Sequence, residues 1–463
     1  MGVAEAARSS PSFRPPSPLA YAPLAMRTSA AALLALALLS PGLARADGAF
    51  PVQLQVFLPT DQPNRIVLIT NFGILRSDDS GASWSYLCEA LAGQSSAIGL
   101  YQFGPDETLL GDSYGGLVRT QDLGCSWSVA GGKLSGSYAW DAAFDPLVPG
   151  HVLALAQGPS GGGSSAIYPS TDDAATFGSA VFAMQGNLTG IEFSQASRGV
   201  VYATGGEADA PDGSLGAPFV LLSHDGGQSW GAPIDHPELG VGILYLAGAG
   251  LSDPATAYFR WVPSSGASEE LLVTHDSGQT LSSIFEAPAA MTAFVELPSG
   301  VLYVGTQTSG AQPTGLWSAP PAGDGGAQPF AAIAPTRVKC LGQRAGTLYV
   351  CGDNWADRFA LGIAQDGGTI VQDGGEAYTP LLTFVQIGGL AECPGTSVQA
   401  TCGTTWTALE SLFGIDAGTP ALDAGPSSTA PPKGCGCGAA STGPGFALLA
   451  LLALVALRSR RRA

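Results

Sequence analysis

Acidic side chains next to aromatic rings are the residues of this chain that could do chemistry on a sugar. A glycoside hydrolase needs two carboxyl groups about 5–10 Å apart, and neighbouring rings can stack on the substrate. Three places combine these residue types: Asp141 beside Tyr138 and Trp140, Glu207 with Asp209, and Asp353 and Asp357 around Trp355. Because the combination is also common at the edges of repeated β-sheets, catalysis is a secondary hypothesis, and we assign no catalytic residue.

The segment 352–359 is our candidate ligand-binding loop. It joins two expected strands, so it should project from the surface. Trp355 would anchor a ligand, and Asp353, Asp357 and Arg358 would supply polar contacts. The same groups could instead satisfy one another within the loop, and the sequence leaves both alternatives open.

One turn pattern recurs through the middle of the chain: Ser/Thr-x-Asp-x-Gly-x-Ser/Thr-Trp. The complete copies contain Asp79, Gly81 and Trp84, then Asp122, Gly124 and Trp127, then Asp225, Gly227 and Trp230. Incomplete copies contain Asp172 and Phe177 without the glycine, Asp276 and Gly278 without the aromatic residue, and Asp-Gly-Gly alone at Asp324 and Asp366. The pattern indicates one structural unit used repeatedly.

Each position of this repeated turn has a structural role. The Asp side chain can accept hydrogen bonds from backbone N–H groups of its own turn, and glycine allows a positive φ. The Trp ring is expected to be buried between neighbouring sheets. A calcium ion needs about six to eight oxygen ligands, whereas the turn offers one carboxylate. We therefore expect no metal at these turns and no cofactor.

The spacing of the turns predicts the architecture. The seven aspartates lie 42 to 53 residues apart, a period that suits a four-stranded propeller blade. Segments 200–204, 301–305 and 347–351 are near copies rich in strand-forming residues. We predict an all-β fold, a seven-bladed β-propeller of four-stranded blades, with eight blades as the alternative because the last two turns are degenerate.

The repeated turn resembles the Asp-box, or BNR, repeat of sialidases, sortilin-type receptor domains, xyloglucan-degrading glycoside hydrolases and propeller-type photosystem assembly factors. Segment 144–153 resembles the phrase that precedes Asp boxes in several of those families. The resemblance covers roughly residues 50–390 and implies a fold, not an activity. A sialidase would also need an arginine triad; only residues 64–67 partly match its arginine motif, so Arg65 is interpreted as a strand residue.

The N-terminal region has the features of an export signal. Residues 26–46 contain a charged start, an apolar run and a small-residue end, which predicts a signal peptide cleaved between Ala46 and Asp47. Residues 1–25 fit no part of such a signal and are interpreted as untranslated or unstructured. Residues 47–415 would then form the propeller with a short C-terminal disulfide loop.

The C-terminal region is predicted to be a sorting tail on a linker. Residues 416–434, rich in Pro, Ala and Gly, are expected to be flexible. Residues 435–463 contain Cys435 and Cys437, a short apolar run and an arginine cluster, and resemble the MYXO-CTERM type of surface-sorting signal. The resemblance implies a sorting machinery that acts on the tail. A retained membrane helix stays open, although twelve apolar residues at about 1.5 Å each are shorter than a ~30 Å hydrocarbon core.

The six cysteines outside the tail indicate disulfides, because exported proteins favour disulfides over metal thiolates. By proximity along the chain we predict three pairs: Cys340–Cys351, Cys393–Cys402 and Cys88–Cys125. About fifteen connectivities are open to six cysteines, so these pairs are one choice among several.

The charge balance limits the partners. A net charge of −18 with three lysines excludes the basic surface that nucleic acid requires, and it leaves the tail as the only expected membrane contact. The leading hypothesis is an exported binding or scaffold module, without enzyme activity, that holds an unknown glycan or protein ligand at the blade rim or in the central channel. The alternatives are a glycoside hydrolase and a purely structural envelope protein.

Overall fold

The computed structural model describes residues 51–92, 101–111, 116–158, 163–207, 216–307, 315–321, 329–364 and 378–415. The predicted signal peptide with Ala46 and Asp47, the linker, and the tail with Cys435 and Cys437 lie outside these residues. Asp209, Asp324 and Asp366 also lie outside them. The predictions made for these segments and residues therefore stay predictions.

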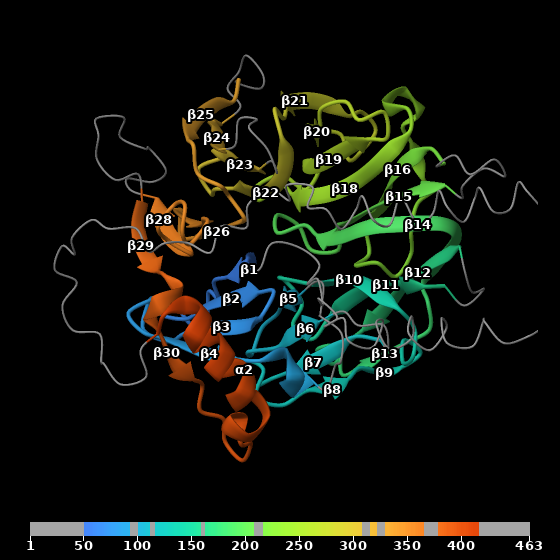
Figure 1. The fold of residues 1–463 in the computed structure, drawn as a ribbon. Helices are drawn as coiled ribbons and strands as arrows, with labels where there is room; N and C mark the ends of the chain where they lie inside the picture. The colour runs from blue at the N-terminus through green and yellow to red at the C-terminus, as the bar shows by residue number, and fades with distance from the viewer. Residues whose placement is uncertain are drawn as a thin grey trace, which may run out of the picture.

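The described chain is almost entirely β-sheet, and its sheets follow one another in chain order around a common centre (Figure 1). The first sheet contains β1 (Gln53–Phe57), β2 (Ile66–Thr70), β3 (Gly73–Ser77), β4 (Trp84–Leu87) and, from the far end of the chain, β30 (Ile387–Leu390). The second contains β5 (Tyr101–Phe103), β6 (Leu109–Gly111), β7 (Val118–Thr120) and β8 (Ser128–Val129).

The remaining large sheets complete the ring. A seven-stranded sheet contains β10 (Ala139–Phe144), β11 (Val152–Gln157), β12 (Ser164–Ser170), β14 (Phe182–Phe193), β15 (Val201–Glu207), β16 (Pro218–Ser223) and β17 (Ile234–Asp235). The next contain β18 (Gly242–Ala249), β19 (Ala257–Pro263), β20 (Glu270–Thr274) and β21 (Ser282–Glu286), then β22 (Ala290–Glu296), β23 (Leu302–Gln307), β24 (Gly315–Ala319) and β25 (Ala331–Ala334). The last contains β26 (Cys340–Arg344), β27 (Thr347–Cys351), β28 (Leu361–Ala364) and β29 (Tyr378–Leu382), and a small sheet pairs β9 (Gly131–Gly132) with β13 (Thr176–Phe177).

The repeat predicts seven separate four-stranded blades, and the structure differs from this prediction. Five sheets of four or five strands form separate blades, whereas the seven-stranded sheet is continuous through β14. The physical reason is the length of β14: its first part pairs with β12, and its second part, from Gly186 on, pairs with β15. Two neighbouring repeats are thereby joined by hydrogen bonds along one strand.

The first strands of the successive repeats surround the centre; we call them the inner strands (β1, β5, β10, the second part of β14, β18, β22 and β26). Five of them contain a β-bulge, at Leu54, Trp140, Thr189, Ala247 and Thr292. A bulge turns a side chain out of the regular alternation of a strand. All five bulged residues line central cavities described below.

Side chains connect the inner strands to their neighbours around the whole ring. The contacts, in chain order, are Tyr101 N to Gln55 Oε1 (3.0 Å), Gln102 Nε2 to Asp141 Oδ1 (3.3 Å), Ile191 N to Asp141 Oδ2 (3.0 Å), Thr189 Oγ1 to Leu244 O (2.5 Å), Met291 N to Glu269 Oε2 (2.9 Å), Thr292 Oγ1 to Val338 O (2.8 Å) and Arg344 Nη1 to Arg65 O (2.7 Å). Apart from the contact between the Gln102 and Asp141 side chains, each of them occupies a backbone group that would otherwise be unpaired.

Apolar faces of neighbouring sheets form the core. Strand β2 is buried along its whole length, and β11 is buried except at its last residue. Such continuous apolar strands are expected where both faces of a sheet are covered. The core is therefore distributed between the blades and leaves the centre of the ring hollow.

The C-terminal segment closes the ring by returning to the first blade. Strand β30 pairs in parallel with β4, and helix α2 (Val398–Phe413) packs against this sheet, with the ring of Trp406 5.6 Å from that of Tyr86. Short 3-10 helices lie at η1 (Glu89–Ala92), η2 (Pro237–Leu239) and η4 (Phe384–Gln386). In the described part of the chain, no helix is long and apolar enough to cross a membrane.

The disulfides correct the predicted pairing and the predicted C-terminal loop. Cys340–Cys351 is present, but Cys88 is bonded to Cys402 and Cys125 to Cys393. Proximity along the chain failed because the fold brings the C-terminal segment onto the first two blades. The two long-range bonds thus connect segments 314 and 268 residues apart, and α2 takes the place of the expected small disulfide loop.

Candidate functional site

The repeated turns satisfy their own polar groups. In the first copy, Asp79 accepts hydrogen bonds from the backbone N–H of Ser83 (2.9 Å) and from its hydroxyl (2.6 Å). The hydroxyl contact from Ser83 is the main cause of a lowered pKa of Asp79. The same two contacts recur at Asp122, Asp172, Asp225 and Asp276. These carboxylates are therefore committed to holding turns.

The turn backbone explains the glycine and the aromatic residue. Gly81 has a φ of 95°, and in the copy without glycine Ala174 adopts a φ of 62° instead. The indole of Trp84 donates a hydrogen bond to Gly81 O, as Trp127 does to Gly124 O and Trp230 to Gly227 O. In the described residues, no group of three or more His, Cys, Asp or Glu side chains could hold a metal.

The loop 352–359 uses its acidic groups internally. Asp353 accepts from the backbone of Trp355 and Ala356, and Asp357 accepts from the backbone of Asp353 (2.7 Å) and Arg337 (3.0 Å). Trp355 is 55% exposed and stands edge-on to Phe384. The loop thus offers one exposed ring, while both carboxylates already bind their own backbone.

Arg65 and Glu207 lie away from the centre of the ring. Arg65 pairs with Asp78 (2.6 Å) and Glu107, an ion-pair arrangement that needs no substrate carboxylate. Glu207 is exposed and lines a peripheral cavity of about 510 Å³ together with Asp235. The structure therefore separates these residues from Asp141.

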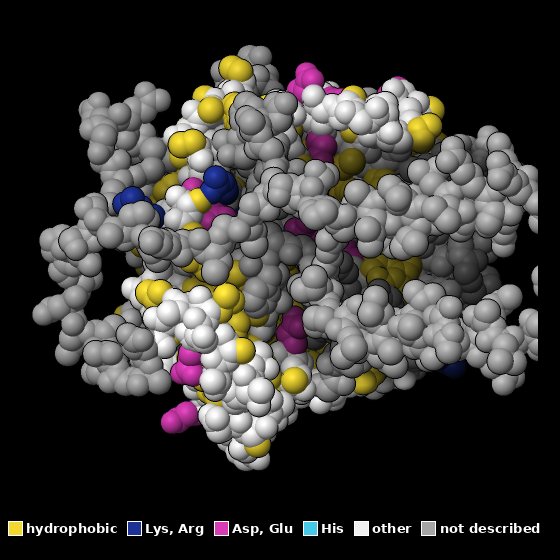
Figure 2. Space-filling model, viewed as in Figure 1, with side chains coloured by type: hydrophobic (Ala, Val, Ile, Leu, Met, Phe, Trp, Pro, Cys, Tyr) yellow, Lys and Arg dark blue, Asp and Glu magenta, His cyan; other side chains and the backbone are white. Residues whose placement is uncertain are grey.

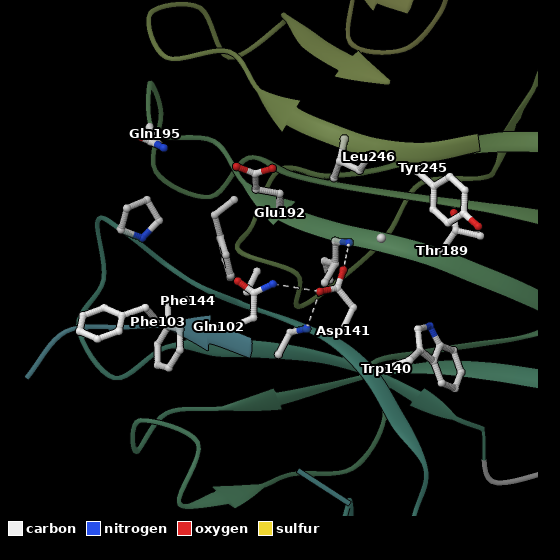
Figure 3. A pocket seen from close by; sticks show the side chains of 16 residues that line it. Gln102, Phe103, Trp140, Asp141, Phe144, Thr189, Glu192, Gln195, Tyr245 and Leu246 are labelled. Atoms are coloured by element: carbon white, nitrogen blue, oxygen red, sulfur yellow. Dashed lines mark hydrogen bonds between the residues drawn. The ribbon is translucent and has the colours of Figure 1, made fainter. Parts of the chain in front are cut away.

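Asp141 lies in a cavity of about 640 Å³ at the centre of the ring, which we call the acidic cavity. Its walls come from β5, β10, β14 and β18. Its polar and large aromatic lining side chains include Gln102, Trp140, Asp141, Glu192 and Tyr245, all labelled in Figure 3. Four inner strands from different repeats thus build one site.

Asp141 is held firmly by its neighbours. Its carboxylate accepts hydrogen bonds from the backbone N–H groups of Ala142 (2.8 Å) and Ile191 (3.0 Å) and from the side chain of Gln102 (3.3 Å), drawn as dashed lines in Figure 3. These donors belong to three inner strands. Asp141 therefore acts as a fixed negative group that ties the wall together.

Glu192 is the second carboxyl group of the acidic cavity. Burial, with a smaller contribution from the charge of Asp141, raises the pKa of Glu192 to about 7. A hydrogen bond from the backbone of Ala249 opposes this shift. Near neutral pH the side chain can therefore exchange a proton easily.

A second central cavity, of about 540 Å³, adjoins the first; we call it the apolar cavity. Its walls include Val56, Phe57, Met291, Phe294 and Leu341, and it shares Gln102, Tyr245 and Leu246 with the acidic cavity. Its cation, Arg260, pairs with Glu269 through two hydrogen bonds of 2.8 and 2.9 Å. Shared walls make the two cavities adjacent sections of one central channel.

Sequence reasoning identified Asp141 and Trp140 but missed Glu192 and Tyr245. No local motif marks these two residues, because they are brought together only by the ring of inner strands. Their common signal is position: each lies in the first strand of a repeat, about 50 residues from its counterpart in the next repeat. Aligning the repeats would have placed them in the channel wall.

The sequence matches no known family and no curated protein. Among solved structures, an ancestral GH74 enzyme matches with a TM-score of 0.50 at 13% identity, covering 72% of this chain and 46% of that one. A puromycin-hydrolyzing peptidase of Mycobacterium tuberculosis gives 0.48 at 13%, covering 73% and 55%. YCF48 bound to a D1 peptide gives 0.38 at 15%, covering 57% and 77%.

The likeness to the GH74 structure shows the fold alone: the chain is a β-propeller protein. It spans about half the length of the GH74 structure it matches. The identities are too low to carry an activity from any of these proteins to this chain.

Proposed function

We propose that the protein is an exported binding module whose ligand enters the central channel at the acidic cavity. The observation that supports this most is the cavity itself, whose walls contain a fixed carboxylate, a titratable carboxyl group and the ring of Trp140. Ligand pockets of proteins have volumes of about 300–1,000 Å³, and this one lies within that range. A defined cavity favours binding over a purely structural role.

The proposal includes the finer architecture. Dividing the seven-stranded sheet at β14 gives seven inner strands and seven blades, in agreement with seven inter-blade contacts. The turns would then be Asp boxes of the BNR type. Three disulfides in the described chain favour an oxidising compartment, which fits export through residues 26–46 and surface display through the tail.

A binding screen tests the proposal. The full exported protein is incubated with soluble glycans and peptides, and hits are measured by calorimetry on the wild type and on Tyr245→Ala. Tyr245 is 36% exposed in the channel, so its truncation should weaken binding without unfolding the protein. The matched control is Trp355→Ala, since Trp355 is 55% exposed but outside the walls of both central cavities. Equal loss in both variants, or no hit, would contradict the channel site.

A glycoside hydrolase is the second candidate, favoured by the raised pKa of Glu192 beside Asp141. Glu192 would donate a proton to the leaving oxygen, and Asp141 would be the second carboxylate. Against this candidate, both oxygens of Asp141 already accept hydrogen bonds. Hydrolysis of a polysaccharide by the wild type, lost in Glu192→Gln, would establish the enzyme and overturn the binding proposal.

A further inference from the structure

The acidic cavity has a one-sided charge. Its described lining contains two carboxyl groups, Asp141 and Glu192, and no Lys, Arg or His. The protein as a whole has a net charge of −18, and basic side chains appear at only a few places on the described part of the face in Figure 2. A cavity whose charged lining groups all have one sign concentrates ligands of the opposite sign.

The two carboxyl groups of the cavity are not equivalent. Asp141 is occupied by three donors from the protein, whereas Glu192 faces the cavity with one backbone contact, at Ala249. The indole ring of Trp140 lines the same space (Figure 3). The Trp140 indole donates to Leu188 O, four residues along β14 from Glu192, so the ring and the Glu192 carboxyl line different parts of the cavity. A cationic nitrogen is the group that pairs with a carboxylate, and Glu192 is the carboxyl group available for it.

The adjoining apolar cavity favours a different part of a ligand. Its walls are mainly apolar, and the charge of Arg260 is already compensated by Glu269. An apolar group is therefore favoured there, and a free anion is not. Because the cavities share Gln102 and Tyr245, one elongated ligand could reach both.

We propose that the channel binds an elongated amphiphilic amine, with its protonated nitrogen in the acidic cavity and its apolar body in the apolar cavity. This inference rests on the proposed function and names the ligand class of the same site.

Binding of a cationic ligand beside Glu192 should release protons, and this release distinguishes it from binding of a neutral ligand. Glu192 is partly protonated near pH 7, and a cation bound beside it favours the ionised form, so binding should release a fraction of a proton. The other titratable groups on the cavity wall are Asp141 and Tyr245. A neutral ligand would release none.

The test compares three probes with the same eight-carbon tail and different heads: octylammonium, octyl glucoside and octyl sulfate, each below its micelle concentration. Calorimetry on the full exported protein, in buffers of different ionisation enthalpy, measures affinity and proton release. We expect octylammonium to bind about tenfold more tightly than octyl glucoside, and octyl sulfate not to bind. Glu192→Gln should abolish the proton release and weaken octylammonium binding about tenfold, to the level of octyl glucoside. Glu286→Gln, an exposed residue outside the channel, should change neither.

The outcomes separate this inference from the proposed function. Equal or tighter binding of octyl glucoside, affected by Tyr245→Ala, would overturn the amine but leave the channel site in place. Binding of octylammonium without proton release, or unchanged in Glu192→Gln, would overturn the role of Glu192 and the inference with it. Absence of binding by all three probes would also overturn it, and the glycan and peptide screen would then decide whether the channel binds anything.

Discussion

At the residue scale, the channel depends on two carboxyl groups with opposite tasks. Asp141 accepts three hydrogen bonds, which connect three inner strands. Glu192 has a raised pKa and lines the open cavity. Environment, not residue type, separates the two roles. Both roles can be tested without knowing the ligand.

The stability of the protein should respond to Glu192 with a defined sign. Its pKa is raised from 4.5 to about 7 in the folded state, so the folded protein binds more protons than the unfolded chain between these values. Stability is therefore lost as pH rises from about 4.5 to 7, by on the order of 3 kcal/mol at most. Glu192→Gln should unfold at a higher temperature than the wild type at pH 8 and at nearly the same temperature at pH 5, measured by circular dichroism. No gain at pH 8 would contradict the assigned pKa.

Asp141→Asn should destabilise the protein. An amide can accept at its oxygen, but its NH₂ group would face the N–H of Ala142 or Ile191, leaving a buried donor unpaired. We expect the free energy of unfolding to fall by about 1–3 kcal/mol, as measured by denaturant unfolding. Asp235→Asn, at an exposed residue outside the ring contacts, is the control and should be near neutral. Equal effects would refute the role given to Asp141.

At the element scale, the repeated turn was predictable from sequence because its chemistry is local. Asp79 and Ser83 are four residues apart, so spacing alone determines their contact. The partners of Asp141 and Cys402 were not predictable, since they lie 50 and 314 residues away and meet only when the ring closes. The fused sheet was missed for a related reason: nothing in the sequence stops β14 between its two partner strands.

The glycine of the repeated turn should be required for both conformation and space. Gly227 has a φ of 80°, and a Cβ there would lie 2.5 Å from Leu153 Cδ1. Gly266 has a φ of 75° but nothing within 4 Å. We therefore expect Gly227→Ala to cost about 1–3 kcal/mol more than Gly266→Ala, measured by chemical denaturation. The same cost in both variants would show that Leu153 moves aside freely.

The long-range disulfides should matter more than the local one. In the chain-entropy account, stabilisation grows with the loop that is closed. Because Cys125–Cys393 already ties the same segments together, Cys88–Cys402 closes a loop of roughly 46 residues, against 11 for Cys340–Cys351. Removing Cys88–Cys402 as a double Ser variant should therefore cost about one and a half times as much as removing Cys340–Cys351. The melting temperatures of the two variants provide the measurement. A larger fall in melting temperature on removing Cys340–Cys351 would contradict the stabilising role given to Cys88–Cys402.

At the scale of the whole molecule, the blades form a ring around a hollow centre, and the C-terminal segment closes this ring through β30 and two long-range disulfides. Repetition supplies one inner strand at a time, side-chain contacts join each to the next, and the returning C-terminal segment locks the ends together. The fold class could be read from the period of the turns. The channel site could not, because its residues come from four repeats and have no shared motif.

The most direct test of the central claim is a crystal structure of the full protein with a hit from the ligand screen. The account predicts ligand density in the acidic cavity, between Trp140 and Glu192. Ligand at the exposed ring of Trp355 instead, with an empty channel, would contradict it.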